Sequence, residues 1–251
     1  MDKFQHTCEI CNNSEWQVIY HGPIRDGSFG SVTDEDCLVA QCENCGAQRL
    51  PEQVCRDTSF YEGEEYRNLL KEPTDVSGYC LEHDKMQLLN MSVIWPQSVR
   101  DKTIADIGCG GGSFLDHING LPKDILAIEP CQTYHESLKE RGYQVYSFAN
   151  DAAAKHCGKV DFAFSFSVIE HVNNPREFLA DIGKLLSSDG SLVVSTPNRS
   201  DVLMSLLADE YPHFFYRTVH RWYFDIDSFS QCARYAGLEV VEAKCVHRFG
   251  L

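Results

Sequence analysis

A cluster of glycines in this sequence would suit close contact with a small ligand. In the stretch ADIGCGGGSF, residues 105–114, Gly108, Gly110 and Gly112 alternate with other residues directly after an apolar run. Glycine has no Cβ atom, so it allows a tight turn and lets a ligand approach the backbone closely. Asp106 lies just before these glycines. Its negative charge would repel a pyrophosphate but would favour a ligand that carries ammonium and sulfonium groups.

A second acidic residue lies at the distance expected for a nucleotide-like ligand. Glu129 ends the next apolar run, DILAIEP, 21 positions after Gly108. A carboxylate at such a distance can bind both hydroxyls of a ribose. The glycine spacing differs from the G-x-G-x-x-G fingerprint of dinucleotide sites. A turn without a ligand and a degenerate dinucleotide site are the alternatives, and the glycines together with Asp106 and Glu129 disfavour both.

Paired cysteines predict a metal site near the N-terminus. Cys8 and Cys11 form one C-x-x-C pair, and Cys42 and Cys45 form another. Two such pairs supply the four thiolates of a tetrahedral zinc site, and a site with four protein ligands is structural rather than catalytic. Four ordinary thiols or one redox-active pair are the alternatives, and the doubled spacing favours zinc.

The elements that must position these residues follow from the alternation of the sequence. We expect strands over 103–108, 124–130, 143–148, 160–167, 191–198 and 238–246, and helices over 113–120, 133–142, 175–190 and 225–237. Such alternation predicts an α/β fold with a parallel sheet and helices on both of its faces. The glycine turn would then follow the first strand of the sheet.

Three segments of different composition suggest the domain organisation. Residues 1–60 hold the paired cysteines and two expected hairpin strands, 16–22 and 36–42, and form a small zinc-binding domain. Residues 61–100 are polar and expected to be helical, with an interruption at Pro73, so they would serve as a linker or a lid over the ligand. Residues 101–251 would form the ligand-binding domain.

Composition and charge exclude several classes of protein. The net charge is −15, and residues 1–60 carry 10 acidic and 4 basic side chains. Such a charge repels phosphate backbones, so nucleic acid is not expected as a partner. The N-terminus lacks the apolar segment of a secretory signal. No apolar run has the roughly 18 residues needed to cross a membrane. These features predict a cytoplasmic protein with no membrane partner.

The motifs ADIGCGGGSF, LAIEP, FSFSVIEHV and LLSSDGSLVVSTPN, in this order, resemble those of class I S-adenosylmethionine-dependent methyltransferases over about residues 100–245. The resemblance implies a Rossmann-like sheet and an S-adenosylmethionine cofactor. The glycine loop with Asp106 would surround the amino-acid part of that cofactor, and Glu129 would bind its ribose. The other residues that the resemblance implies for the cofactor site are Ile128 and Pro130 beside the adenine, Asn150 and Asp151 at its amino group, and Phe166 and Ser167 near the methionine part.

Two narrower resemblances bear on the methyl acceptor. A zinc domain before such a fold, and the stretch FYRTVHRWYF, are similar to sugar C-methyltransferases, which implies a sugar or nucleotide sugar methylated at oxygen or carbon. Glu170 and His171 resemble the acid and histidine that can hold a divalent cation in quinone-biosynthesis O-methyltransferases. Ser167 replaces the earlier acid of that set, so we expect no metal there and a helix-start role for Glu170. The alternatives are a methyltransferase acting on RNA or protein, with the zinc domain as reader, and a non-catalytic binding module.

Methyl transfer from a sulfonium needs mainly positioning, with a base where the acceptor must lose a proton. His220 is the first candidate, because it follows the expected fifth strand and is surrounded by aromatic residues. A histidine packed in an aromatic core is the alternative. Tyr216, Tyr223, His171 and His213 are the other candidates.

The end of the sequence predicts an incomplete sheet. Class I folds usually finish with a seventh, antiparallel strand, and nothing remains after residue 251 to form it. We therefore expect a shortened sheet or a tail beyond this sequence. An uncovered strand edge would invite pairing with a second copy of the chain, which predicts a homodimer.

Overall fold

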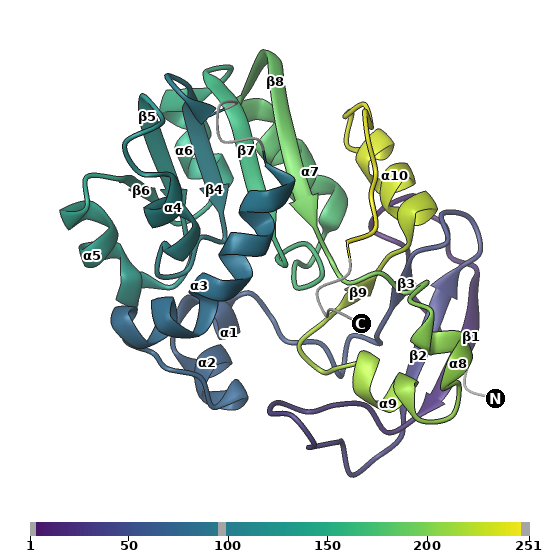
Figure 1. Cartoon of the computed structure of the whole chain (residues 1–251). Helices are drawn as coiled ribbons and strands as arrows, with labels where there is room; N and C mark the ends of the chain where they lie inside the picture. Colours follow the sequence, from purple (N-terminus) through teal and green to yellow (C-terminus); the bar gives the residue numbers. More distant parts are fainter. Residues whose placement is uncertain (1–3, 95–98, 247–251) are drawn as a thin grey trace. The chain divides into compact units, whose positions relative to one another are not determined.

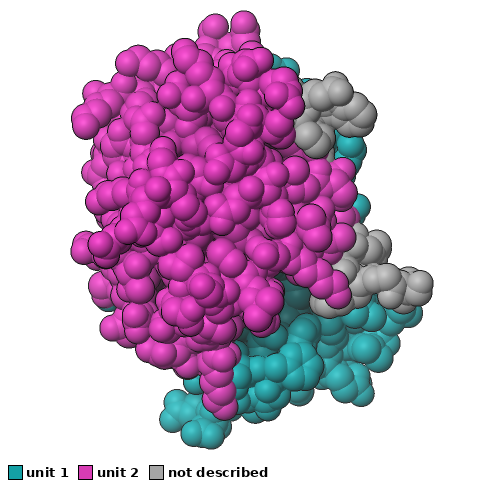
Figure 2. All heavy atoms as spheres, turned by 60° about the vertical axis from the view of Figure 1, so that its left-hand side comes forward, with its two compact units in different colours: residues 1–58, 169–180, 196–245 teal, residues 59–168, 181–195, 246–251 magenta. Residues whose placement is uncertain are grey.

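The computed structural model describes residues 4–94 and 99–246, and the chain divides into two compact units (Figures 1 and 2). Unit 1, teal in Figure 2, comprises residues 1–58, 169–180 and 196–245. Unit 2, magenta in Figure 2, comprises residues 59–168, 181–195 and 246–251. Each unit is therefore assembled from segments that lie far apart in the sequence.

Unit 2 contains a parallel sheet, with the strand order β6-β5-β4-β7-β8. Its strands are β4 (Thr103–Ile107), β5 (Asp124–Ile128), β6 (Gln144–Tyr146), β7 (Val160–Phe166) and β8 (Leu186–Ser195). β4 and β5 are short runs rich in aliphatic residues and mostly buried, as expected for a parallel sheet covered on both faces. Because β4, β5, β6 and β7 all run in the same direction, the loops that follow them share one edge of the sheet.

Three helices of unit 2 share one buried cluster with strands of this sheet. Tyr79 of α3 (Val76–Val93), Phe114 of α4 (Ser113–Ile118) and Leu138 of α5 (His135–Glu140) contribute to it together with Ile104 and Phe164 of the strands. Burial of such large apolar side chains supplies most of the stability of an α/β unit. The remaining helices here are α1 (Ser59–Glu62), α2 (Glu65–Leu70), η2 (Gln132–Tyr134), α6 (Ala149–His156) and α7 (Pro175–Leu185), whose first half is grouped with unit 1.

The helical segment expected before the glycine loop is present and is interrupted around Pro73. Helix α2 ends at Leu70, and Lys71 adopts a left-handed conformation with φ 58°. Helix α3 starts again at Val76, where the Asp75 side chain accepts a hydrogen bond from the backbone N–H of Gly78 at 2.9 Å. This cap satisfies one of the backbone donors that the first turn of a helix leaves unpaired.

Unit 1 is built on a four-stranded antiparallel sheet of order β1-β2-β3-β9. The expected hairpin is present as β1 (Trp16–Gly22) and β2 (Cys37–Cys42), followed by β3 (Gln48–Arg49). Strand β9 (Trp222–Tyr223) comes from the far end of the sequence and was not expected. The helices of this unit are α8 (Leu203–Leu206), α9 (Tyr211–Phe215) and α10 (Ile226–Tyr235).

The fold class is confirmed: a Rossmann-like α/β sheet is accompanied by a small sheet near the N-terminus. One strand prediction is wrong, because residues 238–246 form no strand. A strand needs a hydrogen-bonded neighbour, and within residues 4–94 and 99–246 this segment pairs with none. Its apolar side chains are not buried either, since Val241 is 91% exposed. No described helix is both long and apolar enough to cross a membrane.

Candidate functional site

The glycine loop of unit 2 joins the end of β4 to the start of α4 and turns through left-handed backbone at three positions. Gly108, Gly110 and Gly112 have φ values of 77°, 53° and 84°. L-residues rarely adopt such a conformation, so the backbone alone favours glycine at these positions. Gly112 is also the residue from which α4 begins. The loop therefore presents backbone rather than side chains at the carboxyl edge of the sheet.

Glu129 is hydrogen-bonded to this loop. It follows β5 directly, is 7% exposed, and its Oε2 accepts a hydrogen bond from the backbone N–H of Gly110 at 2.7 Å. Its Oε1 accepts another from the backbone N–H of Cys131 at 2.8 Å. Burial raises the pKa of Glu129, and these two donors oppose that rise. The acid found 21 positions after Gly108 in the sequence therefore contacts the glycine loop directly, at Gly110.

Asp106 is a second buried carboxyl group beside the same loop. It lies in β4 and is 3% exposed. Burial raises its pKa to about 8, and the charge of Glu129 contributes to that rise. A cation bound next to these two carboxyl groups would reverse both effects, because it stabilises the ionised forms. The pair therefore suits a ligand whose adjacent groups are positively charged.

The other residues implied for the cofactor lie at the ends of β5, β6 and β7. Ile128 is buried in the sheet, and Pro130 is half-buried directly after Glu129. Ser167 follows β7 in a left-handed conformation with φ 57°, and its N–H donates to the carbonyl of Ser195 at 2.9 Å. Phe166 is half-buried, whereas Asn150 and Asp151 are exposed in the first turn of α6. All of them are in unit 2, along with the glycine loop.

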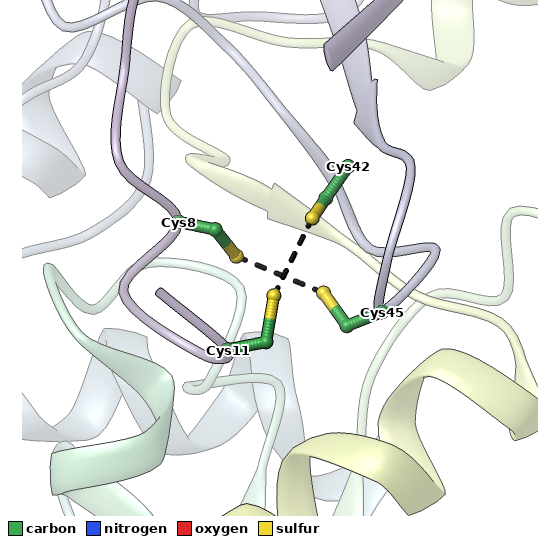
Figure 3. Close-up of side chains that lie close together, drawn as sticks. All are labelled: Cys8, Cys11, Cys42 and Cys45. Carbon is green, nitrogen blue, oxygen red and sulfur yellow. Dashed lines mark hydrogen bonds between the residues drawn. The ribbon is translucent and has the colours of Figure 1, made fainter. Parts of the chain in front are cut away.

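The four paired cysteines come together in unit 1 (Figure 3). Their sulfur atoms lie within 4.8 Å of one another, with 3.7 Å between Cys8 and Cys45 and 3.5 Å between Cys11 and Cys42. Zinc–sulfur bonds of about 2.3 Å in tetrahedral geometry would separate the sulfur atoms by about 3.8 Å. The spacing of these thiols therefore fits one zinc ion at their centre.

Two similar turns hold these cysteines. The residue after Cys11 is Asn12 and the residue after Cys45 is Gly46, and both adopt left-handed conformations with φ 61° and 75°. The N–H of Asn12 donates to the carbonyl of Cys8, and the N–H of Gly46 donates to the carbonyl of Cys42. Each turn therefore directs two sulfur atoms of one C-x-x-C pair towards the same point.

Two of the candidate bases, His171 and His220, are neighbours within unit 1. The rings of His171 and His220 meet edge to face, with centroids 4.7 Å apart. His220 is 4% exposed, and burial, helped by His171 and Arg25, places its pKa well below the ordinary value. His171 is half-buried, and its Nδ1 is 2.6 Å from the carbonyl oxygen of Val219. The lowered pKa keeps the His220 imidazole neutral at pH 7.

Glu170 lies beside this histidine pair and was assigned a different role from the sequence. Its carboxylate and the ring nitrogens of His171 and His220 lie within 4.8 Å of one another. Its Oε2 accepts a hydrogen bond from the hydroxyl of Thr196 at 3.0 Å. Helix α7 begins only at Pro175, so the expected helix-start role of Glu170 is wrong. No sequence spacing relates Glu170 to His220, because the contact depends on how the chain folds back.

The two candidate tyrosines are packed in the core of unit 1. The Tyr216 hydroxyl donates to Oε1 of Gln48 at 3.0 Å, and the Tyr223 hydroxyl donates to the carbonyl of Arg217 at 3.1 Å. Burial raises the pKa of Tyr216 to about 12 and that of Tyr223 well above its ordinary value. Hydroxyls with such pKa values stay protonated at neutral pH and therefore cannot accept another proton. The histidines are the stronger candidates for the base.

Comparison with known proteins yields matches of sequence and of fold. Residues 83–243 match a protein family described as "Methyltransferase domain". The chain is similar to a ubiquinone biosynthesis O-methyltransferase of Thiobacillus denitrificans, with 29% identity over 157 residues, which cover 56% of this chain and 66% of the relative. A protein of the same name from Caulobacter vibrioides is 33% identical over 105 residues, covering 39% of this chain and 42% of the relative.

Neither relative is matched over two thirds of its own length. Among solved structures, a SAM-dependent methyltransferase from Archaeoglobus fulgidus superposes with a TM-score of 0.50 and 17% identity, over 63% of this chain and 73% of the other. Similarity at this level of identity concerns the fold alone.

Proposed function

Because the chain belongs to the methyltransferase-domain family, which matches residues 83–243, we propose that it transfers a methyl group from S-adenosylmethionine to an oxygen atom of a small molecule. The observation that carries this proposal is the hydrogen bond between Glu129 and the N–H of Gly110. This hydrogen bond joins Glu129, which is expected to bind the ribose, to the loop that is expected to bind the amino-acid part of the cofactor. The names of the similar proteins support oxygen as the accepting atom.

The charges around the glycine loop fit this cofactor. When bound, S-adenosylmethionine supplies an electrophilic methyl group on a sulfonium sulfur. Asp106 and Glu129 are two buried carboxyl groups beside the loop, and burial raises the pKa of both. The ammonium and sulfonium groups would place positive charge next to these carboxyl groups and favour their ionised forms. In its ionised form, Glu129 would accept hydrogen bonds from the ribose hydroxyls, and the loop backbone would hold the amino-acid end.

Transfer to a hydroxyl group also requires removal of a proton. A lone pair of the acceptor oxygen forms the new bond to the methyl carbon, and the electron pair of the broken carbon–sulfur bond stays on sulfur. The hydroxyl proton then passes to a base. His171 and His220 are proposed for this step, with Tyr216 and Tyr223 less suitable because of their high pKa values. With Nδ1 of His171 donating to Val219, its Nε2 carries the lone pair that can accept a proton.

We further propose that Cys8, Cys11, Cys42 and Cys45 bind one structural zinc ion. The distances between their sulfur atoms support this, as does the position of Cys42 at the end of β2, next to the turn that leads into β3. Four protein ligands leave no open position for a substrate, so the ion would stabilise the small sheet rather than take part in catalysis. A structural zinc ion contributes its binding free energy directly to folding.

The identity of the acceptor stays a prediction. The expectation of a sugar or nucleotide sugar finds no support in the names of the similar proteins, which instead point to an O-methyltransferase of ubiquinone biosynthesis. The most informative experiment is incubation of the purified protein with deuterium-labelled S-adenosylmethionine and two acceptor panels, one of phenolic compounds and one of nucleotide sugars. Mass spectrometry would report which panel gains the labelled methyl group. The unlabelled demethylated product of the cofactor would confirm turnover independently.

A further inference from the structure

Tyr79 lies directly on the glycine loop. It belongs to the first turns of α3 and is 5% exposed. A Cβ atom added to Gly110 would lie 2.3 Å from the Tyr79 hydroxyl oxygen, and one added to Gly111 would lie 2.6 Å from Cδ1 of its ring. Both distances are far below van der Waals contact. The closest approach to the loop at these two glycines is therefore made by a protein side chain.

Neighbouring groups hold the Tyr79 ring in this place. The ring of His83 stacks on it, with centroids 4.1 Å apart and an interplanar angle of 10°. Tyr134 packs against it with a centroid distance of 5.3 Å. The start of α3 is fixed by the cap at Asp75. Tyr79 is thus a preorganised part of the loop environment, and it can present its hydroxyl with little further loss of conformational entropy.

Arg67 provides a positive charge at the same place. Its guanidinium carbon lies 4.8 Å from the centroid of the Tyr79 ring and 5.1 Å from that of Tyr66. Its side chain is 16% exposed and forms an ion pair with Glu72. Burial alone would lower the pKa of Arg67, but Tyr79, Tyr66 and Glu72 raise it overall. The guanidinium group therefore remains a cation beside the Tyr79 ring.

Two kinds of group therefore lie near the loop: carboxyl groups, which attract positive charge, and a hydroxyl donor with a neighbouring guanidinium, which attract negative charge. Asp106 and Glu129 favour positive groups of a ligand and would repel a carboxylate. The hydroxyl of Tyr79 can donate a hydrogen bond, and no hydrogen bond of this hydroxyl is found within the described residues 4–94 and 99–246. Arg67 adds a positive charge next to the Tyr79 ring. A zwitterionic amino-acid group would satisfy both preferences if its carboxylate faced Tyr79 and its ammonium faced the acids.

We propose that Tyr79, supported by the charge of Arg67, binds the carboxylate of the cofactor's amino-acid end. This inference rests on the proposed use of S-adenosylmethionine and adds a residue that the sequence motifs did not indicate. Under this proposal, the segment that contains α1, α2 and α3 takes part in binding the cofactor. That segment contributes a donor and a cation to the cofactor site, in addition to covering the core.

The test compares two ligands that differ only in this carboxylate. Calorimetric titrations would use S-adenosylmethionine and decarboxylated S-adenosylmethionine with the wild-type chain, Tyr79→Phe and Arg67→Met. Loss of a hydrogen bond to a charged group corresponds to a decrease in affinity of about 10- to 100-fold. We expect this decrease for S-adenosylmethionine with Tyr79→Phe, and only a small change for the decarboxylated ligand. Arg67→Met should show the same selectivity.

A matched control is available in unit 1, which holds none of the residues proposed for the cofactor. The hydroxyl of Tyr20 donates to the carbonyl of Pro23 at 2.6 Å, so Tyr20→Phe also removes one hydrogen-bonded hydroxyl but should leave both affinities unchanged. An equal decrease for both ligands with Tyr79→Phe would overturn the assignment, as would no decrease for either. Failure of the wild-type chain to bind either ligand would instead overturn the proposed function, and this assignment with it. Melting temperatures would show that each variant is folded.

Discussion

The Oε2 atom of Glu129 accepts a hydrogen bond from the backbone N–H of Gly110 at 2.7 Å, so the acid that follows β5 is bonded directly to the loop that follows β4. Any change in the loop backbone therefore also moves the partner of Glu129. This contact and the charges near it determine the direction of two further effects. The cysteine and histidine clusters of unit 1 determine the direction of two more.

Replacement of Gly110 by alanine should cost more stability than replacement of Gly120. Both glycines have positive φ, 53° and 82°, so both variants carry the strain of alanine in left-handed backbone, about 1–2 kcal/mol. A Cβ at Gly120 would meet nothing within 4 Å, whereas one at Gly110 would collide with Tyr79. Chemical denaturation of both variants would measure the difference. Equal losses would show that Tyr79 does not constrain the loop.

Asp106 should make both stability and cofactor affinity depend on pH. Its folded pKa of about 8 lies above its ordinary value of 3.8, so folding takes up a proton. The stability contributed by this neutral buried group is fully present below about pH 4 and is lost as the pH rises through about 8. Cofactor affinity should change in the opposite direction, because the cationic ligand binds the ionised carboxyl group better.

Asp106→Asn separates these effects from those of other groups. The variant should show a flatter dependence of stability on pH between about 4 and 8, because asparagine does not titrate. It should also bind S-adenosylmethionine more weakly at pH 8. Asp189 is exposed in the same unit, so Asp189→Asn is a suitable control and should change neither property. An unchanged pH profile in Asp106→Asn would mean that another group, such as Glu129, carries the titration.

Protein purified without added metal should contain one zinc ion per chain. Replacement of Cys11 by serine should remove the ion and lower the melting temperature, because a structural zinc site contributes directly to folding. Cys157 is exposed and outside the cluster, so Cys157→Ser should retain both the metal and the stability. Metal analysis together with thermal denaturation checks this. A metal-free wild-type chain with the same melting temperature would contradict the prediction.

The histidine pair should affect turnover without affecting cofactor binding. His171→Gln and His220→Asn each remove one imidazole, and loss of a general base typically lowers kcat by about 10²- to 10⁴-fold. The affinity for S-adenosylhomocysteine should remain close to that of the wild type. If a variant loses stability but keeps its turnover per folded molecule, that histidine is a packing residue. His21 is exposed, and His21→Asn serves as the control.

The sequence predicted most of what depends on short-range spacing. The glycine loop could be predicted because its residues are contiguous, and the cluster of four cysteines because each C-x-x-C turn holds two sulfur atoms close together. Glu129 could be predicted because the helix and the strand between Gly108 and Glu129 have an almost fixed length. In all three cases, local geometry restricts where the side chains can lie.

Contacts between distant segments could not be predicted in this way. Tyr79 carries no motif, and its place on Gly110 and Gly111 depends on how α3 packs in the core of unit 2. Strand β9 has only two residues, so no periodicity identifies it, and it exists because β3 offers hydrogen-bond partners. Residues 238–246 show the opposite case. Their apolar side chains suggest a strand, but among the described residues no neighbouring strand pairs with them.

The central claim is that the chain binds S-adenosylmethionine at the glycine loop with its ribose on Glu129. A calorimetric titration with S-adenosylhomocysteine, the demethylated form of the cofactor, tests it most directly when the wild-type chain and Glu129→Ala are compared. We predict one binding site per wild-type chain, and affinity reduced by about 10- to 100-fold in the folded variant, as expected for lost hydrogen bonds to a charged group. No binding to the wild type, or equal affinity in Glu129→Ala, would contradict the account.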